Sequence, residues 1–346
     1  MRRAIYRGDE ADGRALFARA PLAHLALISA GKPILRTVNA VVVDGFLAFH
    51  GAPAGEKMEG MGGPAVAQVE EQLVTIPSTF IDPQYACPAT TYYLSAQSHG
   101  VLEQVHDPRT KARVLQALME KYQPEGGHIP ITHDDPHYAK QVKGILIAGV
   151  ALREVDCKHK LGQNRKPEER TRIVEQLWQR GKEGDVRVAS LMVRHFPELP
   201  RPAFLPPLRD DGVTFDFFLE GDALDEAATL LADAYWLRET PADMLRRSLG
   251  SPSVCVGARD PEGRLVGFAR ALSDRRVAWI FDAFVATPSR GRGIGDALMK
   301  LLLDHPAVRS AKMVRLRTRD AMRLYERLGF APRTDAGYVE MFRVQP

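Results

Sequence analysis

The chain has 346 residues, of which 45% are apolar and 26% charged, and its formal net charge is +4 at pH 7. At roughly 150 residues per domain this length predicts about two domains, and the lack of any apolar stretch of about 18 residues excludes a transmembrane helix. The basic residues near the N-terminus precede no apolar run, so we expect no secretory signal. Cys87, Cys157 and Cys255 lie far apart without a CxxC pair, and we expect reduced thiols in a cytoplasmic protein.

In the first part of the chain, β-branched and aromatic runs separated by Gly, Pro and Asp predict strands. These runs lie at 22–29, 33–43, 46–50, 65–70, 90–105 and 142–155. Asp107 and Pro108 supply a cap and a first-turn proline for one helix, and Pro167 opens another. The second helix places Ile173, Val174, Leu177 and Trp178 on one stripe. Many long strands with few helices favour a closed barrel for residues 1–196.

A dense run of prolines, from Pro197 to Pro207, predicts an extended linker at 197–212. After it, strands and helices alternate, which predicts an α/β domain over 213–346. The expected strands are 213–220, 253–259, 264–272, 277–286, 313–318 and one near 338–344, and the expected helices are 223–237, 241–249, 291–304 and 320–328.

A glycine-rich turn, Arg290-Gly291-Arg292-Gly293-Ile294-Gly295, connects a strand that ends near Ala286 to the helix 291–304. Such a turn presents unpaired backbone N–H groups and the positive end of the helix dipole to an anion. Glycine is needed there because a β-carbon would block a pyrophosphate pressed against the backbone. The spacing matches neither GxGxxG nor a Walker loop. Taken alone, the turn could also be only a tight connection.

About 30 residues further on, Tyr325-Glu326-Arg327-Leu328-Gly329-Phe330 completes a pattern that resembles the GNAT N-acetyltransferase family over roughly 213–346. The resemblance implies that acetyl-CoA places its pyrophosphate at 290–295 and its pantetheine arm along Phe284, Val285 and Ala286. Tyr325 would protonate the departing thiolate, which suits a phenol with a pKa near 10. Asp282 could accept a proton from the incoming ammonium or could merely cap a strand end.

In the first domain, Asp44-Gly45 joins two strand segments in a hairpin signal, and Phe49-His50-Gly51 leads into a short helix that carries Lys57. This pattern resembles the FMN-binding split-barrel family, in the branch of pyridoxamine-phosphate-oxidase-like and nitroimidazole-resistance proteins. The resemblance implies that Lys57 holds the FMN phosphate, and Arg36 is also available for it. Lys57 could instead be a solvated side chain on an exposed helix.

A second segment, Lys158-His159-Lys160-Leu161-Gly162-Gln163-Asn164-Arg165, resembles the FMN-binding negative transcriptional regulators, in which a serine stands at the position of Gly162. The resemblance covers about 1–196 and implies that FMN lies between two barrels, hence a homodimer formed through this domain. The FMN-binding residues that we expect are Arg36, Thr37, Val38, Asn39, His50, Gly51, Lys57, Ser95, Gln97, Lys160, Gln163 and Asn164.

The sequence therefore predicts a mainly-β split barrel with flanking helices, fused to an α/β GNAT fold. The expected function is acetyl-CoA-dependent N-acetylation of a small amine by a chain that also binds FMN. The alternative is a flavin-dependent reductase, or a flavin-sensing or ligand-sensing transcriptional regulator whose GNAT part is a binding module. No helix-turn-helix pattern is evident, so we expect no nucleic-acid partner, and we expect no membrane partner.

Charge and histidine spacing refine these expectations. Residues 201–250 hold five basic and ten acidic side chains, whereas 251–346 hold 17 basic and ten acidic ones. A positive later half would attract CoA phosphates, and an acidic acceptor side would favour a cationic amine, although the acids could simply solvate a helix face. His128, His133 and His137 lie in a polar loop without the spacing of a metal site, so no metal is expected.

Overall fold

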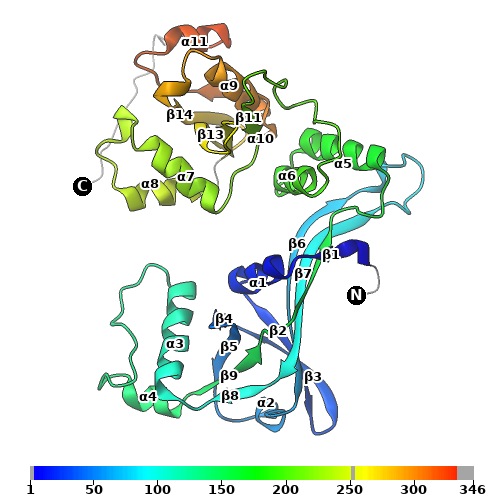
Figure 1. The fold of residues 1–346 in the computed structure, drawn as a ribbon, viewed down its shortest axis with the longest axis vertical. Coiled ribbons are helices and arrows are strands. Elements are labelled where there is room, and N and C mark those ends of the chain that lie inside the picture. The colour runs from blue at the N-terminus through cyan, green and yellow to red at the C-terminus, as the bar shows by residue number, and fades with distance from the viewer. Residues whose placement is uncertain (1–3, 251–253, 333–346) are drawn as a thin grey trace. The chain divides into compact units, whose positions relative to one another are not determined.

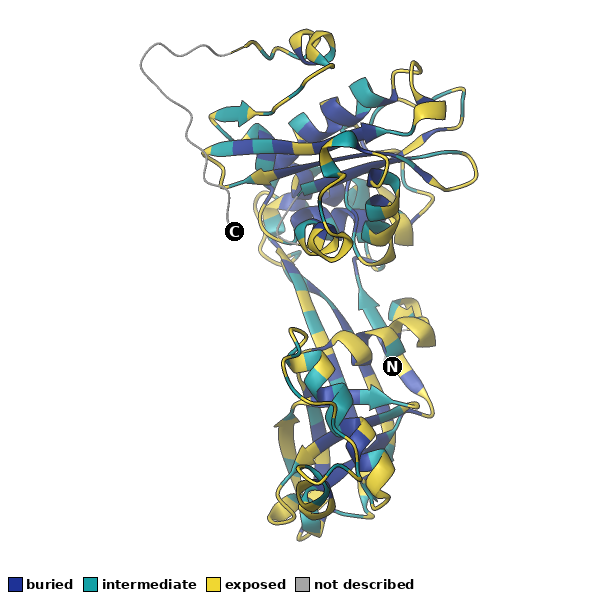
Figure 2. Ribbon diagram, turned by 90° about the vertical axis from the view of Figure 1, so that its left-hand side faces the viewer, coloured by how far each residue is buried: buried dark blue, intermediate teal, exposed yellow. Residues whose placement is uncertain are grey.

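The structure, a computed structural model, describes residues 4–250 and 254–332. The chain divides into two compact units, Met1–Arg170 and Thr171–Pro346 (Figure 1). In each unit, buried residues follow the central strands and the helix faces packed on them (Figure 2). Within the described ranges, no helix combines the length and apolarity needed to cross a membrane.

Two antiparallel sheets build the first unit, with strand orders β1-β10-β7-β6-β2-β3 and β4-β5-β9-β8. The strands are β1 (Arg7–Gly8), β2 (Ala23–Ser29), β3 (Lys32–Val38), β4 (Ala40–Val43), β5 (Phe46–Gly51), β6 (Pro64–Ile76), β7 (Thr90–Val101), β8 (Glu103–Val105), β9 (Leu146–Ala151) and β10 (Val155–Lys160). The helices are η1 (Ala4–Tyr6), α1 (Glu10–Arg19), α2 (Glu56–Glu59), η2 (Ser78–Phe80), α3 (Pro108–Tyr122), α4 (Ala139–Gly144) and the first turn of α5 (Pro167–Arg180).

Two predicted strands break in the middle, and each break carries the chain from one sheet to the other. The run 33–43 divides at Asn39 into β3 and β4, and the run 90–105 divides at Leu102 into β7 and β8. Leu102 is fully buried with Phe17 and Leu47 in the core of this unit. The barrel is therefore split into two open sheets. The closed barrel favoured by the number of strands was wrong, whereas the split barrel implied by the family resemblance is confirmed. The run 142–155 was also too long, because α4 takes its first residues.

Helix α3 follows the sequence prediction. The carboxylate of Asp107 accepts hydrogen bonds from the backbone N–H and the hydroxyl of Thr110, at 2.8 and 2.7 Å, which satisfies a donor of the first turn. Val114 and Leu118 then pack on the four-stranded sheet, beside Ile147. The helix therefore covers that sheet with an apolar face.

One five-stranded sheet forms the centre of the second unit, in the order β11-β12-β13-β14-β15. Its strands are β11 (Thr214–Asp216), β12 (Val254–Arg259), β13 (Leu265–Ser273), β14 (Val277–Val285) and β15 (Met313–Arg315), all antiparallel except the parallel pair β14–β15. The helices are the rest of α5, α6 (Asp185–His195), α7 (Asp222–Leu231), η3 (Tyr235–Leu237), α8 (Ala242–Gly250), η4 (Thr287–Ser289), α9 (Ile294–Asp304), α10 (Pro306–Arg309) and α11 (Met322–Arg327). The strand expected near 338–344 lies outside the described residues.

The end of α5 packs inside the second unit. The fully buried indole of Trp178 stacks on Phe204 with ring centroids 4.0 Å apart and meets Phe217 edge-on at 5.7 Å. Its Nε1 donates to Asp304 Oδ2 at 2.9 Å. Phe204 belongs to the proline-rich segment 197–212, so this segment docks within the second unit, whereas the sequence predicted a linker between domains 1–196 and 213–346.

Candidate functional site

The glycine-rich turn of the second unit leads from η4 into α9. Gly291 and Gly293 have φ of +74° and +75°, a left-handed conformation that favours glycine, and Gly293 is the N-cap of α9. Among the described residues, a β-carbon built on Gly291 would meet no atom within 4 Å, and one on Gly293 would meet only Arg209 Nη1, at 3.9 Å. The described residues therefore leave open space beside both glycines, at the N-terminus of an 11-residue helix whose first N–H groups have no partner within the helix.

Two arginines of this turn make different contacts. Arg290 donates from Nε to the carbonyl of Val285 at 2.9 Å and lies over the ring of Phe284. Arg292 instead pairs with Asp211 at 2.7 Å. Arg209 donates to the same carboxylate and to the carbonyl of Arg292, and its guanidinium holds the pKa of Asp211 well below the usual range. Arg292 thus fixes the turn in place, and the sequence did not identify its partners Arg209 and Asp211.

Strand β14 has one open edge beside this turn. The parallel strand β15 pairs only with Val277, Ala278 and Trp279. From Ile280 to Val285, β14 keeps β13 as its one strand neighbour in the described part of the chain. The unpaired backbone groups of this edge can form hydrogen bonds with an extended ligand that carries amides.

A bulge interrupts β14 within this open stretch. Phe268 pairs with Phe284 and Arg270 with Phe281, so β14 holds one more residue than β13 between these pairs. Asp282 lies in the bulge with φ of +52°, and its carboxylate accepts from Arg270 Nε at 2.5 Å and from Trp236 Nε1 at 3.0 Å. Because both oxygens already have protein donors, the geometry favours a structural role for Asp282 over that of a base.

Tyr325 lies on α11, next to the start of α9, since a β-carbon built on Gly295 would meet Leu324 at 4.0 Å. The residue is 8% exposed and packs edge-on against Phe330 with ring centroids 5.9 Å apart. Burial, followed by nearby Asp320 and Tyr235, raises the pKa of Tyr325 above its ordinary value. The phenol therefore keeps its proton at neutral pH and can donate it.

In the first unit, a cleft of about 460 Å³ opens between the end of β3, the end of β5 and α2. It is lined by Arg36, Thr37, Val38, Asn39, Phe49, His50, Ala54, Gly55, Glu56 and Lys57. Six of the residues expected to bind FMN are among them. A β-carbon on Gly51 would lie 3.1 Å from Lys57 Nζ, so glycine at this position leaves room for the lysine to lie against the strand.

Two charged groups of this cleft neutralise each other. Arg36 forms an ion pair with Glu56, the first residue of α2, while Lys57 is the next residue on the same helix. The sequence did not single out Glu56. A phosphate in this cleft would meet Lys57 directly, and Arg36 would have to exchange its carboxylate partner.

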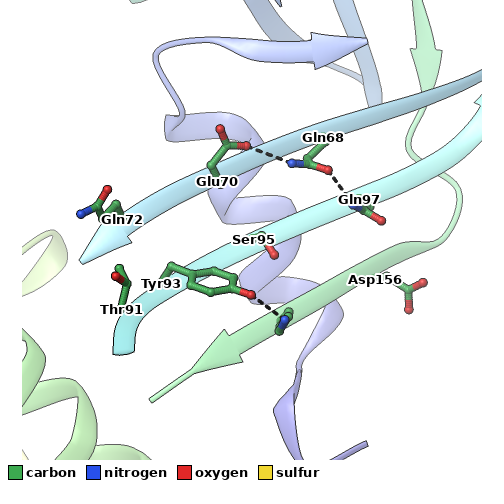
Figure 3. Close-up of a pocket in the computed structure, with 9 residues that line it drawn as sticks. Gln68, Glu70, Gln72, Thr91, Tyr93, Ser95, Gln97 and Asp156 are labelled. Carbon is green, nitrogen blue, oxygen red and sulfur yellow. Dashed lines mark hydrogen bonds between the residues drawn. The ribbon is translucent and has the colours of Figure 1, made fainter. Parts of the chain in front are cut away.

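Gly51 lies beside Lys57 at the same cleft, and the remaining residues expected to bind FMN lie elsewhere in the unit. Ser95 and Gln97 line a second cleft, of about 510 Å³, on the outer face of β6, β7 and β10 (Figure 3). There Lys158 Nζ donates to the hydroxyl of Tyr93 at 2.5 Å. Lys160 Nζ donates to Thr90 Oγ1 at 2.5 Å. The structure therefore does not bring the whole predicted FMN set together within one chain.

The turn after β10 explains why glycine, rather than the serine of the resembling regulators, stands at position 162. Gln163 accepts from the N–H of Leu161 and donates to the carbonyl of His159, so its amide closes its own turn. Asn164 follows in the same turn. Gly162 has φ of +92°, and a β-carbon on it would lie 2.4 Å from the buried hydroxyl of Tyr92. A serine cannot occupy this position while Tyr92 keeps its place.

Comparisons with known proteins identify both units. Residues 9–159 match the family described as pyridoxamine 5'-phosphate oxidase, and residues 222–330 match the acetyltransferase (GNAT) family. A search of curated proteins found no match. No group of three or more His, Cys, Asp or Glu side chains that could hold a metal occurs in the ranges 4–250 and 254–332.

Solved structures resemble one unit or the other. A flavocytochrome from Azotobacter vinelandii is 17% identical, with a TM-score of 0.38, over 45% of this chain and 69% of its own. A protein from Mycobacterium smegmatis that binds FAD and haem is 20% identical, with a TM-score of 0.37, over 44% of this chain and 71% of its own. A protein of Xanthomonas campestris pv. campestris, described as a GNAT-family acetyltransferase, is 31% identical, with a TM-score of 0.32, over 39% of this chain and 95% of its own.

Proposed function

We propose that this chain, which joins a pyridoxamine 5'-phosphate oxidase-like domain to a GNAT acetyltransferase domain, transfers the acetyl group of acetyl-CoA to a small amine. The observation that carries this proposal is the continuity of three features along the chain. The bulge of β14, its open edge and the turn with Gly291 and Gly293 follow one another directly. The N–H groups near the bulge would polarise the thioester, the open edge would pair with the amides of the pantetheine arm, and the turn would bind the pyrophosphate. These three parts follow one another in the same sequence along acetyl-CoA.

In the proposed reaction, backbone N–H groups near the bulge of β14 polarise the thioester carbonyl. The neutral amine nitrogen attacks this carbon, so that a C–N bond forms as the C–S bond breaks. The departing thiolate takes the phenolic proton of Tyr325, and the nitrogen releases its extra proton to solvent. Tyr325 then recovers a proton from solvent.

The acceptor is proposed to be a small amine, and the charge pattern leaves its class open. Asp225 pairs with Arg246 at 3.2 Å, and Glu226 pairs with Arg259 at 2.6 Å. Asp216 also pairs with Arg259. Arg259, which lies outside 201–250, thus neutralises part of the acidic surplus of that segment, which weakens the expected preference for a cationic acceptor.

Two measurements on the full chain test the acetyltransferase proposal. Calorimetry with acetyl-CoA measures binding, and release of the CoA thiol measures turnover with spermidine, kanamycin, phenylalanine and glutamate as acceptors. We expect saturable binding of acetyl-CoA and amine-dependent thiol release with at least one of these amines. Absence of binding would remove the proposal for the turn at 290–295.

We further propose that the cleft of the first unit binds a flavin, with the phosphate of FMN at Lys57. Support comes from the family match, the lysine beside Gly51 and the polar side chains of Thr37, Asn39 and His50 along the same cleft. A bound flavin would supply redox chemistry to this domain. Purified protein with an absorption band near 450 nm, lost on removal of FMN, is the expected result, and a colourless protein that fails to take up added FMN is the contrary one.

A homodimer through the first unit is part of this proposal. The cleft with Lys57 and the outer sheet face with Ser95 and Gln97 are separate in one chain, and a second copy could place its sheet face against the cleft. Sedimentation velocity should then give the mass of two chains. A monomer that still binds FMN would show that one chain suffices.

A further inference from the structure

Asp282 has an unusual backbone for a residue inside a strand. Its φ of +52° lies in the left-handed region, which few L-residues adopt inside a strand, although aspartate and asparagine adopt it more often than most. The same residue forms the bulge at which the register of β13 and β14 shifts. Such a conformation persists only where surrounding contacts hold it, so the contacts of Asp282 decide whether the bulge keeps its shape.

Two donors from different elements hold the carboxylate. Arg270 of β13 donates from Nε at 2.5 Å, and the indole of Trp236, in η3, donates at 3.0 Å. The side chain of Asp282 is only 4% exposed and that of Arg270 11% exposed. A buried carboxylate with both oxygens in use is costly to disturb, because loss of either donor leaves a charged atom without its partner.

Trp236 connects this carboxylate to Phe284 of β14 and to Tyr235 of η3. Its ring packs edge-on against Phe284, with centroids 6.1 Å apart, and against Tyr235 at 4.9 Å. Tyr235 in turn carries the guanidinium of Arg319 over its ring, 3.7 Å from the centroid. The turn η3 therefore contacts the strand proposed to carry the pantetheine arm and is tied to the bulge by one hydrogen bond.

We propose that Asp282 is a positioning residue for acetyl transfer: by accepting from Arg270 and Trp236, it fixes the bulge of β14 and holds η3 against it. This inference rests on the proposed acetyltransferase function. Asp282 orients the backbone amides that face the thioester and the turn that faces the acceptor, and it takes no proton from the amine. Misplacement of reacting groups by about 1 Å can cost about 100-fold in rate.

Trp236→Phe is the sharpest test, because it removes the indole N–H and keeps an aromatic ring against Phe284. With the amine that the wild type acetylates fastest, kcat/KM for the amine should fall at least tenfold, while the Kd for acetyl-CoA measured by calorimetry should change less than about twofold. The acidic limb of the pH–rate profile, which is the fall in rate at low pH, should stay at the same pH as in the wild type. Wild-type kinetics in Trp236→Phe would overturn the proposal.

Asp282→Asn separates positioning from base catalysis. Asparagine tolerates a positive φ and can still accept from Trp236, so we expect an unchanged acidic limb, together with a loss of rate because the buried Arg270 no longer faces a carboxylate. Disappearance of that limb would identify Asp282 as the base and overturn the proposal. Asp260→Asn is the matched control, because it removes another largely buried, arginine-paired carboxylate, in the turn between β12 and β13, and should leave kinetics unchanged.

A double variant guards against misfolding. Arg270→Met with Asp282→Gly removes both buried charges and supplies a residue suited to φ of +52°, so the domain should remain folded by circular dichroism. We expect turnover to stay at least tenfold below wild type because η3 is no longer held. Full activity would overturn the proposal. Absence of acetyl transfer by the wild type would instead refute the proposed function. In that case, a change in the ¹⁵N shift of the Trp236 indole between the wild type and Asp282→Asn would still report the hydrogen bond between Trp236 and Asp282.

Discussion

The imidazole of His305 packs edge-on against the indole of Trp178, with ring centroids 5.4 Å apart. Its Nδ1 accepts from the N–H of Ala307 at 3.2 Å, which caps α10. The side chain is 7% exposed, and burial, followed by the nearby charge of Arg309, lowers the pKa of His305 to about 3. His305 is therefore neutral in the folded second unit across the physiological range.

This neutral histidine should make the second unit acid-sensitive. Unfolded His305 takes up a proton below its ordinary pKa of 6.5, whereas the folded residue does not do so until about pH 3. The unfolded state thus binds more protons in this window, and stability falls as the pH drops from 6.5 towards 3. Between pH 7 and pH 5, we expect a loss of about 2 kcal/mol in the free energy of unfolding.

His305→Asn tests whether His305 causes this acid sensitivity, because asparagine can still cap α10 but does not titrate. Urea unfolding followed by tryptophan fluorescence is selective, since Trp178, Trp236 and Trp279 all lie in the second unit. The variant should lose less stability than the wild type between pH 7 and pH 5. Equal losses would assign the acid sensitivity to other groups.

The sequence predicted the elements of both units better than their packing. Pro167 and the stripe of Ile173, Leu177 and Trp178 correctly indicated α5, because a helix signal is local. The place where that stripe packs depends on Phe204 and Phe217, distant residues that no local pattern connects to it. The prolines indicated extended chain but could not reveal that this chain docks on the helix.

The candidate sites show the same division. The glycine-rich turn before α9 and the short helix that carries Lys57 were predicted from local sequence, whereas the left-handed φ of Gly291 and Gly293 was seen only in the structure. The partners of Asp282 were missed, although one signal was available: Arg270 is a charged residue inside the apolar run of β13, and a buried charge needs a partner. The partner itself follows only from the register of β13 against β14.

Gly293→Val should abolish acetyl-CoA binding. Valine is strained at φ of +75°, and its side chain would fill open space at the N-cap of α9, where we propose that the pyrophosphate binds. Gly263→Val is the matched control, because Gly263 has φ of +82° with nothing within 4 Å and lies in the turn between β12 and β13. Calorimetry should show binding only in the control. Unchanged affinity in Gly293→Val would remove the pyrophosphate assignment.

Tyr325→Phe should bind acetyl-CoA normally and turn over at least about 100-fold more slowly, since only the proton donor is lost. Because burial raises the pKa of Tyr325 above its ordinary value, loss of the phenolic proton should not lower the wild-type rate at neutral or mildly alkaline pH. A stopped-flow pH series on both proteins measures this. If the variant matches the wild type, water or another group supplies the proton.

Lys57→Ala should weaken FMN binding roughly 10- to 150-fold, because a charge-assisted contact contributes about 1.5–3 kcal/mol. Glu56→Gln should act in the opposite direction, since it removes a negative charge from the cleft and releases Arg36. Fluorescence titration with FMN measures both affinities. Weaker binding in Glu56→Gln would mean that the ion pair shapes the cleft rather than competing with the phosphate.

The acetyltransferase unit should need the helices that precede its proline-rich segment. Trp178 is fully buried between Phe204, Phe217 and His305, and Arg309 donates to its carbonyl at 2.7 Å. A chain cut to 213–346 loses Trp178 and Phe204 and exposes Phe217 and His305, whereas a chain cut to 167–346 keeps this cluster.

Since truncating a buried tryptophan to alanine costs about 3–5 kcal/mol, Trp178→Ala should destabilise 167–346 by that amount. The segment 213–346 should be less stable still, because the buried aromatic face loses its whole cover. Urea unfolding followed by circular dichroism measures all three proteins, and equal midpoints for 213–346 and 167–346 would show that α5 and α6 are not part of the folded acetyltransferase unit.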